Sequence, residues 1–321
     1  MQPSASCVLN AIHNTRGDYM TRTSFKYILA IAIVLLPHYC LSAEVLKFKH
    51  GASMLVDEKG GPLKYPEGVA CTATSRVIVA DTGNNRLLSY TLEEQRIKGG
   101  TEIKVAQLAA PILVQVNSKG DIFALDGKKR RIVHLTPEGA FAGYLEPQGV
   151  TGPAGVTTKS FKIDGADSLY LLDIFSERVL VLDPAGKVQR QLPFPANYGF
   201  ISDLAVDNNG TIFLVDSINN MVFSAPKANA VFTPLTQKLS EYAESLTYIT
   251  IDKRGLIILV DKDGGSLVIL GQDGTLQGHL FGVGVKNGLL NYPSQICLTA
   301  TGDLLVADRA NSRVQLFENI K

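Results

Sequence analysis

The sequence predicts an all-β protein, a six-bladed β-propeller of four-stranded antiparallel blades in which an N-terminal strand closes the last blade. The first observation is that four apolar residues followed by aspartate occur six times, at spacings of 43 to 47 residues. These aspartates are Asp81, Asp126, Asp173, Asp216, Asp261 and Asp308. The second is that arginine follows the aspartate by five residues in four copies, namely Arg86, Arg131, Arg178 and Arg313. A fixed period of this length is typical of propeller blades, each with about four strands.

The third observation is the pattern inside each repeat. In the last copy, residues 295–300 and 304–307 read as short strands around a glycine turn, and residues 314–317 form a third strand. Earlier copies contain a fourth run, such as residues 102–108. Short strands bounded by turn residues, without a helical period, indicate an all-β fold. The wholly apolar second strand needs burial on both faces, which neighbouring blades provide.

The chain leaves the sixth repeat one strand short, because only residues 318–321 follow its third strand. Residues 45–49, Val-Leu-Lys-Phe-Lys, have the composition to supply the missing strand. We therefore predict that this N-terminal segment completes the last blade, which removes two free sheet edges at once.

Two copies of the repeat are similar to a known family. Residues 281–317 contain a glycine-rich lead-in, a Tyr-Pro pair and a Val-x-Asp-x-x-Asn-x-Arg core, and residues 65–90 are built alike. This pattern resembles the NHL repeat. Copies two to five are degenerate, and copies four and five lack the arginine, because Met221 and Ser266 stand there. The resemblance implies the propeller fold and says little about activity, because one fold serves many functions.

The first 43 residues read as a leader. Arg22 and Lys26 precede a ten-residue apolar run, and Leu41-Ser42-Ala43 ends in the small residue that a signal peptidase requires. We expect translation to start at Met20 instead of Met1, and residues 44–321 to form a single propeller domain. The predicted location is therefore periplasmic or extracellular, with an uncleaved membrane anchor as the alternative.

The net charge of the mature chain limits the classes of partner that it can bind. Cleavage removes three of 31 basic and one of 30 acidic residues, which leaves 28 and 29 and a net charge near −1. A near-neutral protein without basic runs is a poor nucleic-acid binder. We expect a monomer without a membrane span, whose partner is a protein or glycan of the cell envelope.

Two cysteines remain after cleavage, Cys71 and Cys297. They fall on the inner strands of blades one and six, which ring closure makes neighbours, so a disulfide is one reading. The repeat alignment puts them one residue out of register and hence on opposite faces of their strands. We therefore expect two buried thiols.

The repeated aspartates and arginines are best explained as architecture, because a catalytic group is needed once and not six times. The informative positions are those that break the repeat on the rim formed by the lead-in to each first strand and the loop after each aspartate. Loops positioned by a rigid scaffold commonly carry binding residues. The candidate binding residues are Glu67, Asp203, Glu244, Tyr248, Gln295 and Arg309.

A metal site is the competing prediction. Six-bladed propellers of related types include calcium-dependent lactonases and a zinc- and calcium-dependent lyase, so the resemblance raises the question of a channel metal. The mature histidines, His50, His134 and His279, fall in closing, third and outer strands, away from the axis. Asp261-Lys262-Asp263-Gly264 begins like a calcium loop, but Gln272 stands where a bidentate glutamate would close it. No cofactor is predicted, and calcium stays open because Asp and Asn are plentiful.

Two functions follow. The first is a non-enzymatic, exported scaffold that presents its rim to a protein or glycan. The alternative is a calcium-dependent hydrolase of lactonase type, or a lyase, with a metal in the central channel. The distinguishing feature is a set of three or four Asp, Asn or Glu side chains that point into the channel from different blades.

Overall fold

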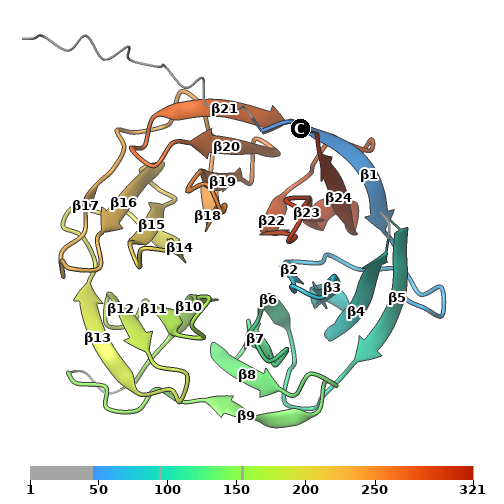
Figure 1. Ribbon diagram of the computed structural model, residues 1–321, viewed down its shortest axis with the longest axis horizontal. Helices are drawn as coiled ribbons and strands as arrows, with labels where there is room; N and C mark the ends of the chain where they lie inside the picture. Colours follow the sequence, from blue (N-terminus) through green and yellow to red (C-terminus); the bar gives the residue numbers. More distant parts are fainter. Residues whose placement is uncertain (1–45, 94–95, 153–154, 321) are drawn as a thin grey trace, which may run out of the picture. The chain divides into compact units, whose positions relative to one another are not determined.

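The protein forms a ring of six antiparallel sheets, each of four strands (Figure 1). The computed structural model describes residues 46–93, 96–152 and 155–320. The six-bladed, all-β prediction is confirmed. The predicted leader, residues 1–43, lies outside the described residues. Within the described part of the chain, no helix has the length and apolar character to cross a membrane.

The blades follow one another in chain order. Blade 1 contains β2 (Gly68–Cys71), β3 (Arg76–Asp81), β4 (Arg86–Glu93) and β5 (Arg96–Ile103). Blade 2 contains β6 (Pro111–Val116), β7 (Ile122–Asp126), β8 (Arg131–Leu135) and β9 (Phe141–Leu145). Blade 3 contains β10 (Thr158–Ile163), β11 (Leu169–Asp173), β12 (Arg178–Leu182) and β13 (Val188–Pro193). Blade 4 contains β14 (Ile201–Val206), β15 (Ile212–Asp216), β16 (Met221–Ala225) and β17 (Thr233–Pro234). Blade 5 contains β18 (Leu246–Ile251), β19 (Ile257–Asp261), β20 (Ser266–Leu270) and β21 (Leu276–Phe281). Blade 6 contains β22 (Pro293–Leu298), β23 (Leu304–Asp308), β24 (Arg313–Asn319) and β1 (Phe48–Met54).

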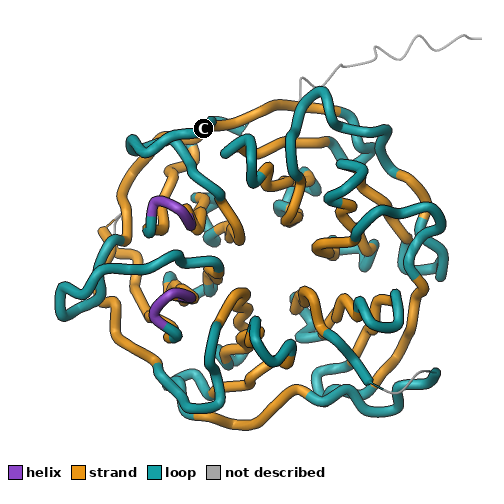
Figure 2. Tube along the Cα trace, turned by 180° about the vertical axis from the view of Figure 1, so that it is seen from behind, coloured by secondary structure: helices purple, strands orange, loops and turns teal. Residues whose placement is uncertain are grey.

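Two short 3-10 helices follow the repeated aspartate in the two best copies of the repeat. They are η1 (Thr82–Asn84) in blade 1 and η2 (Arg309–Asn311) in blade 6. Figure 2, which views the ring from behind, shows them side by side. The repeated sequence phrase therefore marks two neighbouring copies of one structural unit.

The ring is closed by β1, which pairs antiparallel with β24 from Phe48 opposite Asn319 to Met54 opposite Val314. This confirms the predicted closure, although the strand begins later than the predicted residues 45–49. Before this strand, Lys47 accepts a backbone hydrogen bond from Ile320 at 2.9 Å, and Leu46 is buried in the hydrophobic core.

The outer strand of blade 1 also differs from the expectation. It is β5, residues 96–103, and not residues 102–108. Ile103 pairs with Leu87 at the end of this strand. The chain then turns, with the Leu108 amide bonded to the Val105 carbonyl at 3.1 Å, and enters blade 2.

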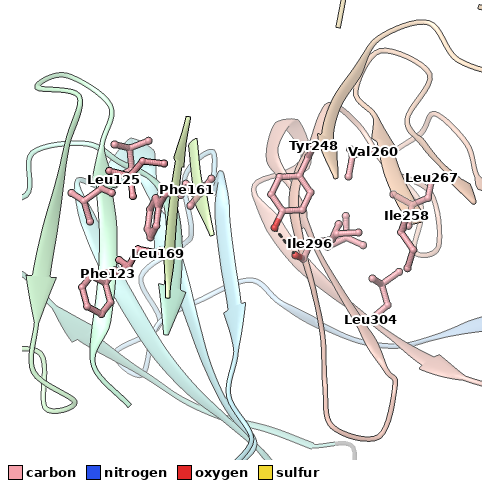
Figure 3. Close-up of a cluster of buried hydrophobic side chains, with 14 of the residues drawn as sticks. Phe123, Leu125, Phe161, Leu169, Tyr248, Ile258, Val260, Leu267, Ile296 and Leu304 are labelled. Atoms are coloured by element: carbon pink, nitrogen blue, oxygen red, sulfur yellow. Dashed lines mark hydrogen bonds between the residues drawn. The ribbon is translucent and has the colours of Figure 1, made fainter. Parts of the chain in front are cut away.

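The hydrophobic core lies between the blades. Every residue of the second strands β7, β11, β15, β19 and β23 is buried, because each strand is covered on both faces by its neighbours. At the seam between blades 6 and 1, Leu305 and Ala307 pack in one cluster with Val77 and Val79. Figure 3 shows part of another cluster, in which Tyr248 and Ile296 approach each other from blades 5 and 6.

Cys71 and Cys297 form a disulfide bond across the seam, with Cα atoms 5.7 Å apart, so the expectation of two thiols was wrong. The one-residue offset does place the two side chains on opposite faces of equivalent strands. Neighbouring blades, however, are related by rotation about the ring axis. One face of a blade therefore packs against the other face of the next, and residues on opposite faces are the ones that meet.

Reduction of this bond should loosen the closed ring. The bond joins residues 226 apart, and cross-links that close long loops stabilise by about 2–4 kcal/mol. We expect reductant to lower the free energy of unfolding by this amount in a denaturant titration. The Cys71→Ser/Cys297→Ser variant should match the reduced protein and ignore reductant. Equal unfolding midpoints for oxidised and reduced wild type would contradict this role.

Candidate functional site

The six repeated aspartates hold the entry of each inner strand. All are buried, at most 2% exposed. Each accepts a backbone N–H from the lead-in segment 16 or 17 residues earlier in its own blade, as in the 2.7 Å bond from Lys64 to Asp81. The equivalent donors are Ala109 for Asp126, Thr157 for Asp173, Gly199 for Asp216, Glu244 for Asp261 and Asn291 for Asp308. One carboxylate per blade thus ties the loop after the second strand to the start of the first.

Three of the four repeat arginines add an ion pair to this link. The Nε atoms of Arg86, Arg178 and Arg313 lie 2.8, 3.0 and 2.7 Å from the Oδ2 atoms of their own aspartates. Arg131 departs from the pattern, because it donates to the Tyr144 hydroxyl at 2.7 Å. In blade 5 Ser266 stands at the arginine position and donates to Asp261 at 3.5 Å. In blade 4 Asp216 keeps the bond from the Asn219 amide, at 2.8 Å, that the equivalent Asn84 makes to Asp81 in blade 1.

The electrostatics of Asp216 show how this carboxylate stays charged while it is buried. Burial raises its pKa, but hydrogen bonds from the Gly199 and Phe200 amides lower it, followed by those from Asn219. The net effect is a pKa below the ordinary aspartate value. Hydrogen bonds to the charged form therefore outweigh desolvation at this position.

The inner strands carry a bulge that shapes the mouth of the central channel. In β6, β10, β14 and β18 the register with the second strand shifts by one residue near the first residues of the strand. A bulged residue is left unpaired and its side chain is re-aimed. The unpaired residues are Ile112, Lys159, Ser202 and Thr247.

These bulged residues belong to one ring of equivalent positions, fourteen residues before each repeat aspartate. The ring is completed by Glu67 in blade 1 and Ser294 in blade 6. All six line one cavity of about 350 Å³, which we call the mouth. Lys262, Arg309, Phe200 and Ser217 also line it, from the loops of the same rim. The mouth is therefore built from one side chain of every blade.

The next ring, thirteen residues before each aspartate, forms the floor of the mouth. Gln295 lies in this ring and bonds to the inward edges of the first strands of blades 1 and 2. Its Oε1 accepts from the Val69 and Val114 amides at 3.2 and 3.1 Å, and its Nε2 donates to the Val114 carbonyl at 2.7 Å. Gly68 occupies the same ring position in blade 1. A Cβ there would lie 2.8 Å from the Ala80 Cβ and 3.1 Å from the Gln295 Oε1, so the approach requires glycine.

A lysine and an aspartate form the charged centre of the channel. Asp203 accepts from the Ile249 amide at 2.9 Å and from the Ser160 hydroxyl. The Lys162 ammonium lies 3.3 Å from Asp203 and 3.6 Å from the centre of the Tyr248 ring. The side chains of both charged residues are less than 10% exposed. The carboxylate is thus engaged by neighbouring groups on both oxygens.

Tyr248 is also held inside the channel. Its hydroxyl donates to the Ile296 carbonyl at 3.3 Å, the contact that is dashed in Figure 3. Burial raises the pKa of this hydroxyl. Together with Gln295 and Asp203, Tyr248 satisfies backbone groups on the inward edges of neighbouring blades, which otherwise would be unpaired.

The opposite end of the channel opens into a second cavity of about 860 Å³. It is lined by the ring eleven residues before each aspartate, Ala70, Gln115, Lys162, Ala205, Thr250 and Cys297, and by turns between first and second strands. The inner strands therefore run from the mouth at one end to this second cavity at the other.

The structure brings five of the six predicted binding residues together around the mouth. Glu67 and Arg309 lie at its entrance and form an ion pair of 3.0 Å between blades 1 and 6. Asp203, Tyr248 and Gln295 lie on its floor and are buried. Glu244 is exposed on the lead-in of blade 5 and does not line the mouth.

Sequence reasoning missed the other residues of the mouth, among them the charged and aromatic residues Lys159, Phe200 and Lys262. The repeat register could have identified Lys159, because it lies fourteen residues before the aspartate of its own copy, as Glu67 does in blade 1. Lys262 corresponds to Arg309, one residue after the aspartate. Phe200 corresponds to Tyr65 and Tyr292 in the lead-in. Alignment of all six copies by this register would have selected them.

The donor set of the channel does not fit a metal ion. Asp203 and Gln295 are engaged by protein groups, and Glu67 pairs with Arg309. His50, His134 and His279 lie in β1, β8 and β21, the closing, third and outer strands of their blades. Among the described residues, no three His, Cys, Asp or Glu side chains converge as ligands. Asp261 accepts from the Ser245 and Gly264 amides, so its loop is a closed turn.

Comparisons with known proteins support the fold and the repeat. Residues 290–317 match the NHL repeat family, so the chain carries an NHL repeat where the resemblance predicted one. No curated protein sequence matches the chain.

Several solved structures share the propeller. A streptogramin B lyase is 16% identical with a TM-score of 0.60, over 86% of this chain and 98% of that one. A gluconolactonase from Xanthomonas campestris is 13% identical with a TM-score of 0.63, over 88% and 93%. A chain of the nidogen/laminin complex is 16% identical with a TM-score of 0.54, over 73% and 92%. At these identities the likeness concerns the fold alone.

The aspartate links can be tested at Asp216. We expect Asp216→Asn to lower the free energy of unfolding by about 1.5–3 kcal/mol at neutral pH, because charge-assisted hydrogen bonds are lost. The folded-state pKa is depressed, so the contribution is present above the unfolded pKa and is lost as pH falls through the folded pKa. The stability difference between variant and wild type should therefore shrink in acid.

The matched control is Asp263→Asn, which removes the same charge from an exposed position in the equivalent loop of blade 5. It should change stability by less than about 0.5 kcal/mol. Equal losses from both substitutions in denaturant titrations would argue against a specific role for the buried carboxylates.

Proposed function

We propose that the protein is an exported binding propeller that presents its rim to a protein or glycan partner in the cell envelope. The rim is the face formed by the lead-in segments and the loops after the repeat aspartates. The observation that carries the proposal is the number of large apolar side chains exposed there. Tyr65, Phe175, Phe200, Ile218 and Tyr292 are between 39% and 71% exposed. Exposed apolar groups collected on one face commonly mark an interaction surface.

The buried carboxylate and phenol on the floor of the channel are poorly placed for catalysis. A general base or nucleophile needs a free side chain within reach of a substrate. The buried candidates are Asp203 and Tyr248. Asp203 already accepts from the Ile249 amide, and the Tyr248 hydroxyl already donates to the Ile296 carbonyl. The competing function, a calcium-dependent hydrolase or lyase, requires several oxygen ligands directed at one point, which the described channel residues do not supply. We therefore propose a scaffold without a resident metal.

The disulfide supports export. Disulfides persist in oxidising compartments such as the periplasm and the extracellular space, and are rare in the cytosol. Cys71 and Cys297 are bonded in this ring. This agrees with the leader predicted from residues 20–43, which lies outside the described residues.

The rim can be tested by partner capture. Immobilised wild-type protein is expected to retain a specific component of an envelope extract from the producing organism. Glu67→Ala/Arg309→Ala should reduce this capture at least tenfold, because it removes the charged pair at the entrance of the mouth. The pair is partly exposed, and such pairs contribute about 0–1 kcal/mol to stability. The melting temperature should therefore fall by no more than about 2–4 °C.

The control variant is Lys119→Ala/Lys187→Ala, in exposed turns that lie outside the rim, which should capture as wild type does. Capture should also persist in EDTA. Retention that is lost in EDTA, or that survives the rim substitutions unchanged, would contradict the proposal and support the metal-dependent alternative or another surface.

A further inference from the structure

The mouth contains positive charge without a counter-ion. Lys159 and Lys262 line it, and neither side chain forms an ion pair or hydrogen bond with the described residues. Arg309 is paired with Glu67, and Asp203 is paired with Lys162 from below. The accessible charge of the mouth is therefore positive, contributed by two free ammonium groups.

This arrangement is costly in the free protein. Lys159 is partly buried, and burial lowers its pKa, followed by the nearby charge of Arg130. The carboxylates of Asp203 and Glu67 raise this pKa, but they do not cancel the effect of burial. A desolvated cation that its neighbours do not fully compensate is stabilised when an anion binds beside it. The mouth is thus prepared for a negatively charged ligand, because the protein supplies the cations and leaves them unpaired.

Aromatic rings alternate with these cations around the entrance. The Lys159 ammonium lies 6.0 Å from the centre of the Phe200 ring, and the Lys262 ammonium 5.6 Å from that of Tyr292. The Arg309 guanidinium lies 5.6 Å from the centre of the Tyr65 ring. Each pair joins one blade to the next. The rings are 39% to 46% exposed, so they offer apolar surface to a bound molecule.

Hydroxyl groups complete the lining. Ser294 donates its hydroxyl hydrogen to the Glu67 carbonyl at 2.7 Å, and Ser217 donates to the Phe200 carbonyl at 3.3 Å. Each oxygen keeps lone pairs that accept hydrogen bonds from a ligand. Thr247 lines the same cavity. This lining suits a ligand that itself carries many hydroxyl groups.

We propose that the mouth binds an acidic saccharide, whose carboxylate is held by Lys159 and Lys262 and whose sugar ring lies against Phe200. The inference rests on the proposed binding function and names its ligand class. Cations, hydroxyls and exposed rings around one cavity match the carboxylate, hydroxyl and apolar faces of a uronic acid. A cavity of about 350 Å³ is at the lower end of the range for small-ligand sites. An acidic peptide would use the cations but few of the hydroxyls.

The test is calorimetric titration of the wild-type protein with trigalacturonate, with neutral maltotriose and with a triglutamate peptide. Trigalacturonate is expected to bind at least tenfold more tightly than either of the others, and more weakly as salt rises. Lys159→Gln/Lys262→Gln should weaken it at least tenfold. Phe200→Leu should weaken it about threefold to tenfold, since it removes the ring and retains the charge.

The matched control is Lys119→Gln/Lys187→Gln, which removes two exposed lysines in turns away from the mouth and should leave binding unchanged. Tighter binding of the peptide, equal binding of the neutral sugar, or no binding of trigalacturonate would overturn the proposal. Retained capture of an envelope component by the rim, together with any of these results, would overturn the ligand class alone. If the protein neither binds trigalacturonate nor captures an envelope component, the proposed function is overturned as well.

Discussion

The structure depends on closure of the ring at the seam between blades 6 and 1. A propeller has no hub, so each blade is covered only if its two neighbours are present. Three contacts of different kinds join this seam. β1 supplies the fourth strand of blade 6, the Cys71–Cys297 bond links the inner strands, and the Gln295 amide bonds to the edges of blades 1 and 2. Without closure the doubly apolar second strands of the end blades would face water.

The candidate site follows from the same constraint. The mouth needs one side chain from each blade, and the ion pair at its entrance joins Glu67 of blade 1 to Arg309 of blade 6. The bulged residues of the inner strands line the mouth, and the repeat aspartates hold the segments that lead into these strands. The invariant part of each repeat is therefore structural, and the variable part surrounds the cavity. This division explains how a repetitive chain builds a single asymmetric site.

Much of the fold could be predicted because each blade repeats the same local chemistry. The six regularly spaced aspartates predicted the number of blades. The wholly apolar second strands predicted that these strands are buried on both faces. Blade 1 and blade 6 were recognisable because η1 and η2 follow from nearly the same eight residues. The starting point of β1 was less predictable, because it is set by pairing with β24 at the other end of the chain, which no local pattern reports.

The disulfide and the mouth required geometry between blades. The one-residue offset between Cys71 and Cys297 does place their side chains on opposite faces of equivalent strands. Because neighbouring blades are related by rotation, these opposite faces meet, and the two thiols can bond. Likewise, Asp203, Tyr248 and Gln295 break the repeat as binding residues would, yet their side chains bond to neighbouring backbone. The repeat register places Lys159 and Lys262 at rim positions, but only closure of the ring brings their side chains to one cavity.

Strand complementation tests ring closure most directly. A chain that starts at Leu55 lacks β1, and its thermal unfolding can be compared with that of the chain that starts at Glu44. Closure by β1 predicts one cooperative transition that is lowered by about 10 °C or more, given ~2–4 °C per kcal/mol for a domain of this size. A peptide of residues 44–54 added in trans should restore the transition. An unchanged melting temperature, or a shift that the peptide does not reverse, would contradict the account.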